Sequence, residues 1–254
     1  MPAVSAIKPK HVYNVNIQRL HHSKLKLKAI THQPLPSKID LRPSMPDVYN
    51  QGPLGSCTAN ALCGAVGFIV KGFTGSRLFV YYNERRMENT ISDDEGAYLC
   101  DGVKTLEKYG VCAEYDWPYD VEKFAVKPPE FCYINATQHL VLSSANVDTD
   151  LYSMKHALAN GFPFVVGISI YAPFESEEVG LTGKVPMPQS KDESLGGHAV
   201  LVCGYNDDTQ EFIVRNSWGP DWGDKGYFYL PYEYLANPTL SSDMWTITAV
   251  SNVV

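Results

Sequence analysis

A cysteine follows a glycine-rich turn at the start of an apolar segment. Residues 50–57 read Asn-Gln-Gly-Pro-Leu-Gly-Ser-Cys, and Ser56 can cap a helix that begins at Cys57. Free N–H groups and the positive end of the helix dipole favour a thiolate there, which makes Cys57 a candidate nucleophile. Gln51 can aim its side-chain amide at the same place, so that with the Cys57 N–H it supplies two donors for an oxyanion. Taken alone, such a cysteine is more commonly an ordinary buried side chain.

Two later segments contain a candidate base and a residue that can orient it. His198 opens a strongly apolar stretch in Gly-Gly-His-Ala-Val-Leu-Val-Cys, and Asn216 lies within Arg-Asn-Ser-Trp-Gly. A histidine at a strand start is held rigidly yet open, which suits an acid–base group. Across an antiparallel pair Asn216 can reach His198 and fix its tautomer, and Trp218 can shield that bond from water. Singly, a buried histidine or a turn asparagine is the commoner interpretation, but the combination predicts a thiol nucleophile with an imidazole base.

Together these segments resemble the papain family of cysteine proteases. Gln51 and Cys57 match the oxyanion glutamine and the nucleophile of that family, at the right separation. His198 within Gly-His-Ala-Val matches its general base, and Asn216 within Asn-Ser-Trp-Gly matches the orienting asparagine. A Trp-Gly-x-x-Gly-Tyr run begins at Trp222, as it does in the family.

The resemblance covers residues 35–254, because the stretch 35–42 is similar to the mature N-terminus of the family. It implies a papain-like two-lobed α+β fold, with a helical left lobe over about 40–135 and an antiparallel β-barrel-like right lobe over about 136–254. The active site is expected in the cleft between the lobes. The order of the elements, helices first and strands later, independently favours an α+β protein.

The implied function is a cysteine endopeptidase that hydrolyses peptides or proteins. A Cys57 thiolate paired with a His198 imidazolium would attack the scissile carbonyl and form a thioester acyl-enzyme. An aminopeptidase, an isopeptidase acting on ubiquitin-like tails and an inactive papain-like binding module stay open as alternatives.

The resemblance also implies which residues bind substrate, although the chain departs from the family there. Ala97 replaces a glycine whose backbone pairs with substrate, Leu54 replaces a cysteine of the family disulfide framework, and Thr58 replaces an aromatic residue. Tyr98 and Leu99 are expected to form an apolar pocket for the second substrate residue, with Asp243 near its floor. The full expected set is Gly96, Ala97, Tyr98, Leu99, Gly197, Trp218 and Asp243.

The apolar spacing predicts the elements that position these residues. Helices are expected over 57–71, 77–88, 96–109 and 150–160, the last two ending at Gly110 and Gly161. Segments rich in Val, Ile, Phe and Tyr between turn residues predict strands over 137–142, 163–170, 198–205, 211–215, 226–230 and 245–250.

Residues 1–34 form a basic arm that precedes an acidic body. The arm has six lysines and arginines and no acidic residue, which leaves a net charge of −13 on residues 35–254. A solvated tail, a patch for nucleic acid or a membrane surface, and a segment that lies back on the body all fit this composition. Inhibitory prosegments of the family are commonly longer and helical, whereas residues 1–34 are short and residues 12–17 alternate like an extended strand. The charge contrast between arm and body nevertheless favours the last of these, a compact inhibitory prosegment, and therefore a zymogen.

The overall composition excludes several other classes. The net charge of −7 argues against nucleic acid as the main partner, and no apolar run is long enough to cross a membrane. The six cysteines have no zinc-ligand spacing, so no metal is expected, and the resemblance implies no cofactor. With no basic start followed by an apolar core, no secretory signal is expected. We therefore expect a monomer in a reducing compartment, intracellular or associated with a virus or bacterium, with its cysteines reduced and buried.

Overall fold

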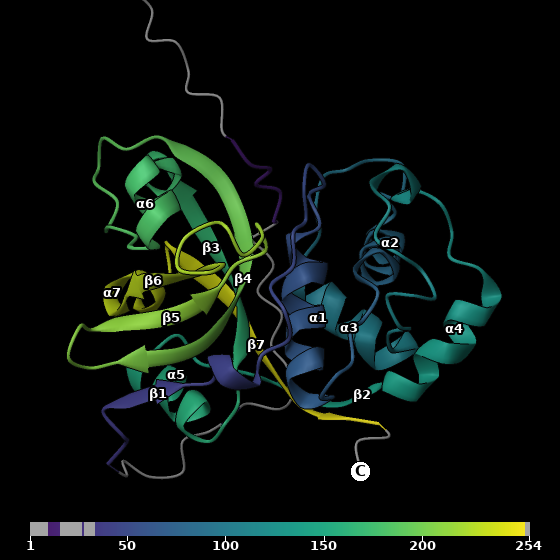
Figure 1. The fold of residues 1–254 in the computed structure, drawn as a ribbon, viewed down its shortest axis with the longest axis horizontal. Coiled ribbons are helices and arrows are strands. Elements are labelled where there is room, and N and C mark those ends of the chain that lie inside the picture. The colour runs from purple at the N-terminus through teal and green to yellow at the C-terminus, as the bar shows by residue number, and fades with distance from the viewer. Residues whose placement is uncertain (1–9, 16–26, 28–33, 252–254) are drawn as a thin grey trace, which may run out of the picture.

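The computed structural model describes residues 10–15, 27 and 34–251 of the 254-residue chain. Within them the chain forms a helical lobe and a lobe built on a β-sheet, side by side (Figure 1). The fold is thus mixed α+β and two-lobed, as the sequence predicts. No helix among the described residues is long and apolar enough to span a membrane.

The helical lobe contains α1 (Cys57–Ile69), α2 (Arg77–Glu88), α3 (Leu99–Tyr109) and α4 (Glu130–Ala136). Helix α1 is buried along nearly its whole length because it packs on α2 and α3 on one side and on the sheet on the other. Ser76 caps α2 by accepting the N–H of Phe79, and α3 ends at Gly110, whose positive φ of 73° suits a glycine. These three helices confirm the predicted ones at 57–71, 77–88 and 96–109 to within a few residues.

The other lobe is an antiparallel sheet in the order β2-β7-β3-β4-β5-β6, with β1 paired to β4. Its strands are β1 (Lys38–Asp40), β2 (Val141–Asn146), β3 (Phe164–Tyr171), β4 (Ser194–Asn206), β5 (Glu211–Arg215), β6 (Tyr227–Pro231) and β7 (Ser241–Val250). The short helices of this half are α5 (Leu151–Ala159), α6 (Glu177–Thr182) and α7 (Tyr232–Ala236). The long central strand β4 is the framework of the lobe, since β1, β3 and β5 all pair with it.

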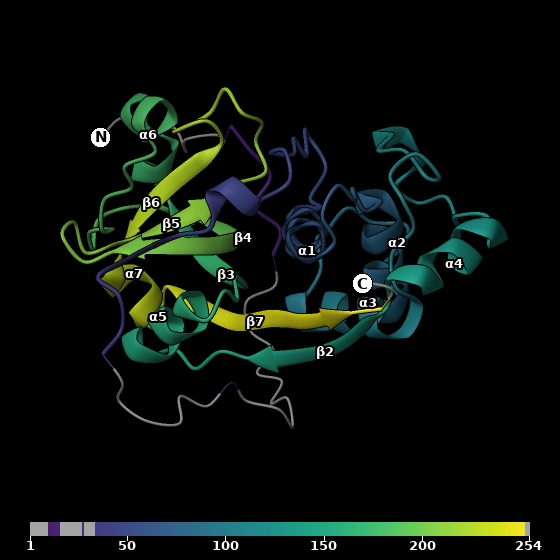
Figure 2. The same ribbon diagram turned by 60° about the horizontal axis from the view of Figure 1, so that its bottom comes forward.

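The expectation of a barrel-like right lobe is wrong in one respect, because the described part of the sheet does not close on itself. Strands β2 and β7 run toward the helical lobe, and β2 packs against α3 instead of returning to β6 (Figure 2). The sheet therefore stays open and its β2–β7 edge joins the two lobes.

Four predicted starts also differ from the structure. Strands β4 and β7 begin at Ser194 and Ser241, four residues before the predicted starts at 198 and 245. The third helix begins at Leu99 and not at residue 96, because Gly96 has a φ of 76° and Tyr98 is an extended N-cap residue. The strand predicted over 137–142 begins only at Val141, since residues 137–139 form a 3-10 turn that continues α4. Strand β1 and helices α4, α6 and α7 were not predicted because each is short and lacks a full period of apolar spacing.

A buried carboxyl lies beneath the N-terminus of α1. Glu84 of α2 has no solvent exposure, and its Oε2 accepts a hydrogen bond of 2.8 Å from the hydroxyl of Thr58. Gly102 of α3 leaves the space that this carboxyl fills, because a Cβ at that position would lie 2.4 Å from Glu84 Oε1. Burial raises the pKa of Glu84 to about 8.

This burial predicts a pH-dependent stability that Glu84→Gln removes. Because the pKa is higher in the folded state, the stabilisation is fully present below pH 4.5 and is lost as the pH rises through about 8. Between pH 4.5 and about 8, we expect the Glu84 carboxyl to lower the free energy of unfolding of the wild type by on the order of 3–5 kcal/mol. Denaturant titrations from pH 4.5 to 8.5 measure it, with the exposed Glu122→Gln as the matched control. Equal pH slopes for wild type and Glu84→Gln would contradict the assignment.

Candidate active site

Cys57 is the first residue of α1 and lies where that helix meets strand β4. Its side chain has no solvent exposure. The backbone N–H of Ala199 lies near enough to the Cys57 sulfur to oppose the effect of burial on the pKa of the thiol, so the thiol lies at the His198–Ala199 peptide. Asp94 fixes the preceding turn by accepting the N–H of Gly55 at 3.0 Å. The helix start and strand β4 thus bring a cysteine and a histidine together from positions 141 residues apart in sequence.

The His198 ring is oriented by an asparagine on the neighbouring chain segment. His198 Nε2 lies 2.8 Å from Asn216 Oδ1, and because that oxygen can only accept, Nε2 carries the proton. Asn216 follows β5, which pairs with β4, and its Oδ1 also accepts the N–H of Ser217 at 2.8 Å. Among the described residues His198 Nδ1 has no hydrogen-bond partner. It is therefore the ring nitrogen available for proton exchange with a group beside it.

Gln51 lies in the same buried region and is held by Ser217. The Ser217 hydroxyl donates to Gln51 Oε1 at 2.6 Å, and the Gln51 backbone N–H donates to the Ser217 carbonyl at 2.9 Å. Gln51 Nε2 donates to the carbonyl of Leu54 at 3.0 Å. An amide nitrogen carries two protons, so this bond leaves one Nε2 proton for a further acceptor.

Ser217 and Tyr119 are site residues that the sequence analysis missed. Ser217 stands between Asn216 and Trp218 and connects the asparagine to the glutamine. The Tyr119 hydroxyl donates to the Gln51 carbonyl at 2.9 Å and lies 2.5 Å from the Ser56 hydroxyl. Ser217 could have been found from its place inside the Asn-Ser-Trp-Gly motif, whereas nothing in the sequence connects residue 119 to residue 51.

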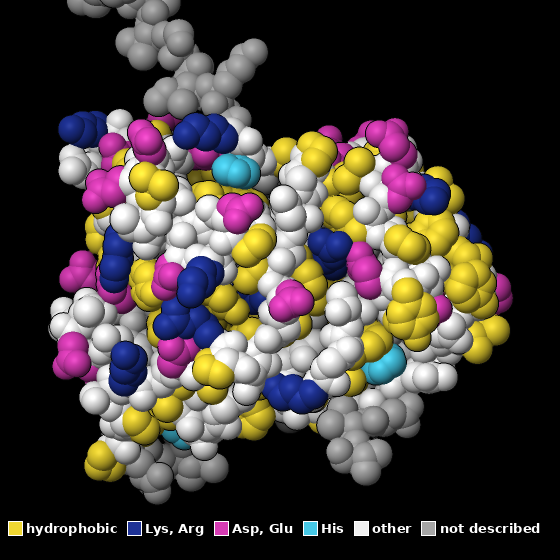
Figure 3. All heavy atoms as spheres, viewed as in Figure 1, with side chains coloured by type: hydrophobic (Ala, Val, Ile, Leu, Met, Phe, Trp, Pro, Cys, Tyr) yellow, Lys and Arg dark blue, Asp and Glu magenta, His cyan; other side chains and the backbone are white. Residues whose placement is uncertain are grey.

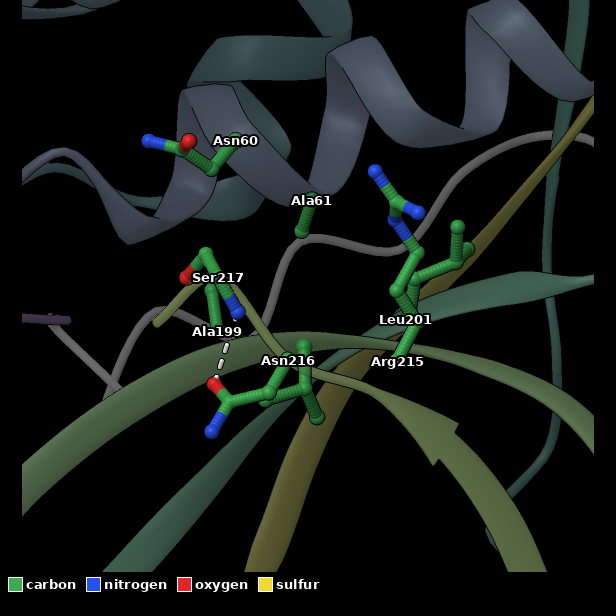
Figure 4. Close-up of a pocket in the computed structure, with 8 residues that line it drawn as sticks. Asn60, Ala61, Ala199, Leu201, Arg215, Asn216 and Ser217 are labelled. Carbon is green, nitrogen blue, oxygen red and sulfur yellow. Dashed lines mark hydrogen bonds between the residues drawn. The ribbon is translucent and has the colours of Figure 1, made fainter. Parts of the chain in front are cut away.

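Behind the site the two lobes pack closely. A cavity of about 10 Å³ lies between α1 and the strands β4 and β5, room for about one water molecule. Ala61 of α1 faces Ala199 and Leu201 of β4 across it, whereas the amide of Asn60 points away (Figure 4). This close packing fixes the position of α1 relative to β4, the strand that contains His198.

The described part of the N-terminal arm lies in this same region. Residues 10–15, which we call the arm segment, run between the lobes in Figures 1 and 2. Tyr13 is buried with the core of the sheet lobe, and Val15 is buried with the core of the helical lobe. The Tyr13 ring meets the His198 ring edge to face, with 6.0 Å between centroids, so the arm segment covers the histidine.

One carboxylate fixes the start of the arm segment. Glu175 accepts the backbone N–H groups of Lys10 and His11, each at 3.2 Å, and the hydroxyl of Tyr13. The His11 ring also contacts Glu175. It stacks nearly parallel on the Trp218 ring, with 3.8 Å between the ring centroids. Burial alone would raise the pKa of Glu175, but the hydrogen bonds from His11 and Tyr13 outweigh it and lower that pKa. The other basic groups of the arm, Lys8, Arg19, Lys24, Lys26 and Lys28, lie outside the described residues.

Backbone contacts hold the rest of the arm segment. Asn14 forms a bridge with Gly197, and the N–H of Val15 donates to the Gly197 carbonyl at 3.0 Å. The Asn14 carbonyl lies so close to Gly96 that a Cβ at Gly96 would come within 1.7 Å of it. Gly96 and Gly197, two of the expected substrate-binding residues, therefore contact the arm segment on opposite sides.

The other expected substrate-binding residues come from both lobes: residues 97–99 lie at the start of α3, Trp218 follows β5, and Asp243 is on β7. Trp218 contacts the arm segment through His11, whereas Ala97 and Leu99 are fully buried. Both oxygens of Asp243 accept hydrogen bonds, from the Cys100 N–H at 3.1 Å and the Trp245 Nε1–H at 2.6 Å. Tyr98 is half-buried, and its N–H donates to Glu88.

With the arm segment in place, burial controls the charge of the Cys–His pair. Burial raises the pKa of the Cys57 thiol to about 12, and burial lowers the pKa of the His198 imidazole to about 4. Both groups are therefore neutral near pH 7 in this arrangement. Within the described residues no cluster of three or more His, Cys, Asp or Glu side chains could hold a metal ion.

Comparison with known proteins defines first the class of fold and then the family. The chain superposes on xylellain, a cysteine protease from Xylella fastidiosa, with a TM-score of 0.83 and 38% identity over 97% of each chain. A digestive procathepsin L 3 of Tenebrio molitor shares the fold, with a TM-score of 0.68 at 21% identity. The fold is thus that of the papain-like cysteine proteases.

Sequence comparison gives the same answer. The profile of the papain family cysteine proteases matches residues 35–243. An uncharacterised peptidase C1-like protein of Acanthamoeba polyphaga mimivirus is 43% identical over 231 residues, 85% of this chain and 74% of that protein. Mouse cathepsin K is 28% identical over 77% of this chain and 60% of its own length. The chain belongs to the papain family of cysteine proteases. It is accordingly a cysteine peptidase, a hydrolase whose substrates are peptides or proteins.

The contacts of Ser217 predict that it positions Gln51. We expect Ser217→Ala to lower kcat about tenfold with little change in KM, because the amide loses its orientation while the substrate contacts remain. Initial rates on one fluorogenic peptide measure this, with active sites counted by a thiol-alkylating epoxide and the exposed Ser92→Ala as control. A raised KM with unchanged kcat would assign Ser217 to substrate binding instead.

Proposed function

We propose that the protein is a cysteine endopeptidase that acts through Cys57 and His198 and is kept latent by its N-terminal arm. One observation supports the catalytic assignment: the Cys57 sulfur lies at the His198–Ala199 peptide, and Asn216 holds the His198 imidazole ring in place. His198 Nδ1 accepts the thiol proton, and the sulfur attacks the scissile carbonyl. The Cys57 N–H and the remaining Nε2 proton of Gln51 stabilise the oxyanion.

The second half of the reaction uses the same groups in reverse. The imidazolium protonates the leaving amine, and a thioester joins the acyl group to Cys57. His198 then takes a proton from water, the hydroxide attacks the thioester, and Cys57 leaves as the thiolate. Asn216 holds the ring in one tautomer throughout, because its Oδ1 accepts the Nε2 proton.

Endopeptidase action is favoured over exopeptidase action by the path of the arm segment. The described segment runs from Trp218 and Glu175 to the space between Gly96 and Gly197. The sequence continues beyond both of its ends. A site that accommodates a chain passing through it also accommodates the interior of a peptide substrate. An aminopeptidase or isopeptidase requires a barrier at one end of that path.

Latency is favoured because the arm segment occupies the substrate path and changes the charge of the catalytic pair. It contacts Gly96, Gly197 and Trp218, so substrate and arm cannot bind together. Covering His198 with the Tyr13 ring removes water from the pair, and burial favours the neutral thiol and imidazole. Release of the arm exposes both groups to water, which favours the thiolate–imidazolium form.

The catalytic assignment predicts the effect of removing the nucleophile. Cys57→Ala should fold with unchanged thermal stability and lose all peptidase activity, because no other described thiol lies beside a histidine that is oriented in this way. Activity on a fluorogenic peptide and covalent labelling by a thiol-alkylating epoxide measure it, with Cys203→Ala as the control. An unlabelled wild type without activity, after removal of the arm, would instead indicate an inactive binding module.

The latency assignment predicts that weakening the arm contacts activates the full-length chain. Tyr13→Ala removes both the ring over His198 and the hydroxyl bound to Glu175, and we expect the rate on a peptide substrate to rise at least tenfold. Glu175→Gln should act in the same direction, whereas Glu178→Gln, exposed on α6, should not. A protein lacking residues 1–34 gives the upper limit. Equal rates for this protein and wild type at neutral pH would contradict latency.

The lowered pKa of Glu175 gives latency a pH dependence. A carboxyl whose pKa is lower in the docked state stabilises docking above its ordinary pKa near 4.5, and that stabilisation is lost as the pH falls through the lowered value. We expect the activity of the full-length chain, assayed at each pH from 3 to 6 and divided by that of the protein lacking residues 1–34, to rise only below about pH 4.5. The Glu175→Gln variant should show no such threshold.

A further inference from the structure

Two buried thiols of the helical lobe lie side by side. Cys112 follows α3 and Cys132 is on α4, and the two thiols lie close enough that each shifts the pKa of the other. Neither side chain has any solvent exposure. Both belong to one small apolar cluster, together with Phe79 and Ala136.

The backbone around the two cysteines is held in place on both sides. The Cys112 carbonyl accepts the N–H of Ser76 at 2.8 Å, at the N-cap of α2. The Cys132 thiol donates to the carbonyl of Asp116 at 3.7 Å, and Asn135 donates to the carboxylate of Asp116 at 3.1 Å. Helix α4 is therefore held against the same turn, residues 113–119, that begins directly after Cys112.

The remaining cysteines pack elsewhere. Cys57, Cys63 and Cys100 are in the core formed around α1 and α3, and Cys203 is in a separate cluster on β4. From the sequence, Cys100 and Cys112 are the first pair to consider because they flank the third helix. The structure instead places the Cys112 thiol against Cys132, because α4 folds back over the end of α3.

We propose that Cys112 and Cys132 are a redox-modification site. A low-molecular-weight disulfide such as oxidised glutathione oxidises the pair, and the product is a disulfide between the two cysteines. One cysteine thiolate attacks a glutathione sulfur, and a mixed disulfide forms as the first glutathione thiolate leaves. The second cysteine then attacks the protein sulfur of that mixed disulfide and displaces the other glutathione. The two cysteines are oxidised, one glutathione disulfide is reduced to two glutathione molecules, and the two thiol protons are taken up by the two leaving thiolates.

The surroundings make this exchange slow in the folded protein at neutral pH. Burial raises the pKa of both thiols, and the Asp116 carboxylate raises both further. Access to the pair is through α4, of which only Cys132 and Ala136 are buried. Its outer side chains Phe131 and Ile134 are 49% and 63% exposed, and apolar atoms gather over α4 in Figure 3. Local opening of this thin surface helix exposes Cys132.

The cross-link would close a loop of about 20 residues that supports the active site. This loop contains Tyr119, which hydrogen-bonds the Gln51 carbonyl and the Ser56 hydroxyl. It also contains Glu114, which pairs with Arg77 of α2 at 2.7 Å. By restricting the unfolded chain, a disulfide of this span should raise Tm by about 6–12 °C.

The test uses the full chain with Cys57→Ser, so that the nucleophile does not consume the oxidant. The protein is incubated with excess oxidised glutathione at about pH 8.5, where more thiolate is present. After alkylation in denaturant, peptides are mapped by mass spectrometry without reduction. We expect one cross-linked peptide pair containing Cys112 and Cys132, with Cys63, Cys100 and Cys203 alkylated, and a Tm higher by the stated amount that falls again on adding reductant.

Two further variants make the result specific. Cys132→Ala should show no cross-link and no reductant-dependent Tm, whereas Cys203→Ala should oxidise like the parent. Alkylation of both Cys112 and Cys132 after oxidation, or a cross-link from either of them to another cysteine, would overturn the proposal. Peptidase activity does not enter the readout, so this outcome and that of the latency experiments are independent.

Discussion

The packing of α1 on strand β4 is the contact on which the rest of the site depends. It brings the N-terminal turn of a buried helix, and with it the Cys57 thiol, to the His198–Ala199 peptide. Helix α1 has no freedom to shift, because it is enclosed by α2 and α3 on one side and by the sheet on the other. A cysteine and a histidine from different lobes therefore keep one geometry without any metal or cross-link between the lobes among the described residues.

The second half of the site is assembled by the segment after β5. Asn216, Ser217 and Trp218 are consecutive, yet their contacts differ. Asn216 holds His198, Ser217 holds Gln51, and Trp218 meets the arm segment through His11. One short segment thus joins His198 to Gln51. This division explains why a change at Ser217 is expected to affect rate more than binding, since it contacts the positioning groups and not the substrate path.

How much of the structure could be predicted depends on how far apart in the sequence the interacting residues lie. Cys57, Gln51, His198 and Asn216 lie in short motifs whose spacing is informative, and the structure brings these four together. The major helices are equally visible because apolar spacing is local. Tyr119 and Glu175 were missed because their partners lie 68 and 162 or more residues away. The open sheet could not be foreseen, because it depends on β2 packing against a helix of the other lobe.

The contacts of the arm segment divide into those made by backbone atoms and those made by particular side chains. Gly96 and Gly197 contact the arm through backbone atoms, and such contacts are available to any extended chain. Contacts that depend on side chains include the Tyr13 hydroxyl on Glu175, the Tyr13 ring on His198 and the His11 ring on Trp218. A substrate that shares only the backbone contacts competes poorly with a tethered segment that makes both kinds. Loss of Glu175 removes the acceptor of the Lys10 and His11 N–H groups and of the Tyr13 hydroxyl, and it leaves the ring contacts and the backbone contacts to hold the arm.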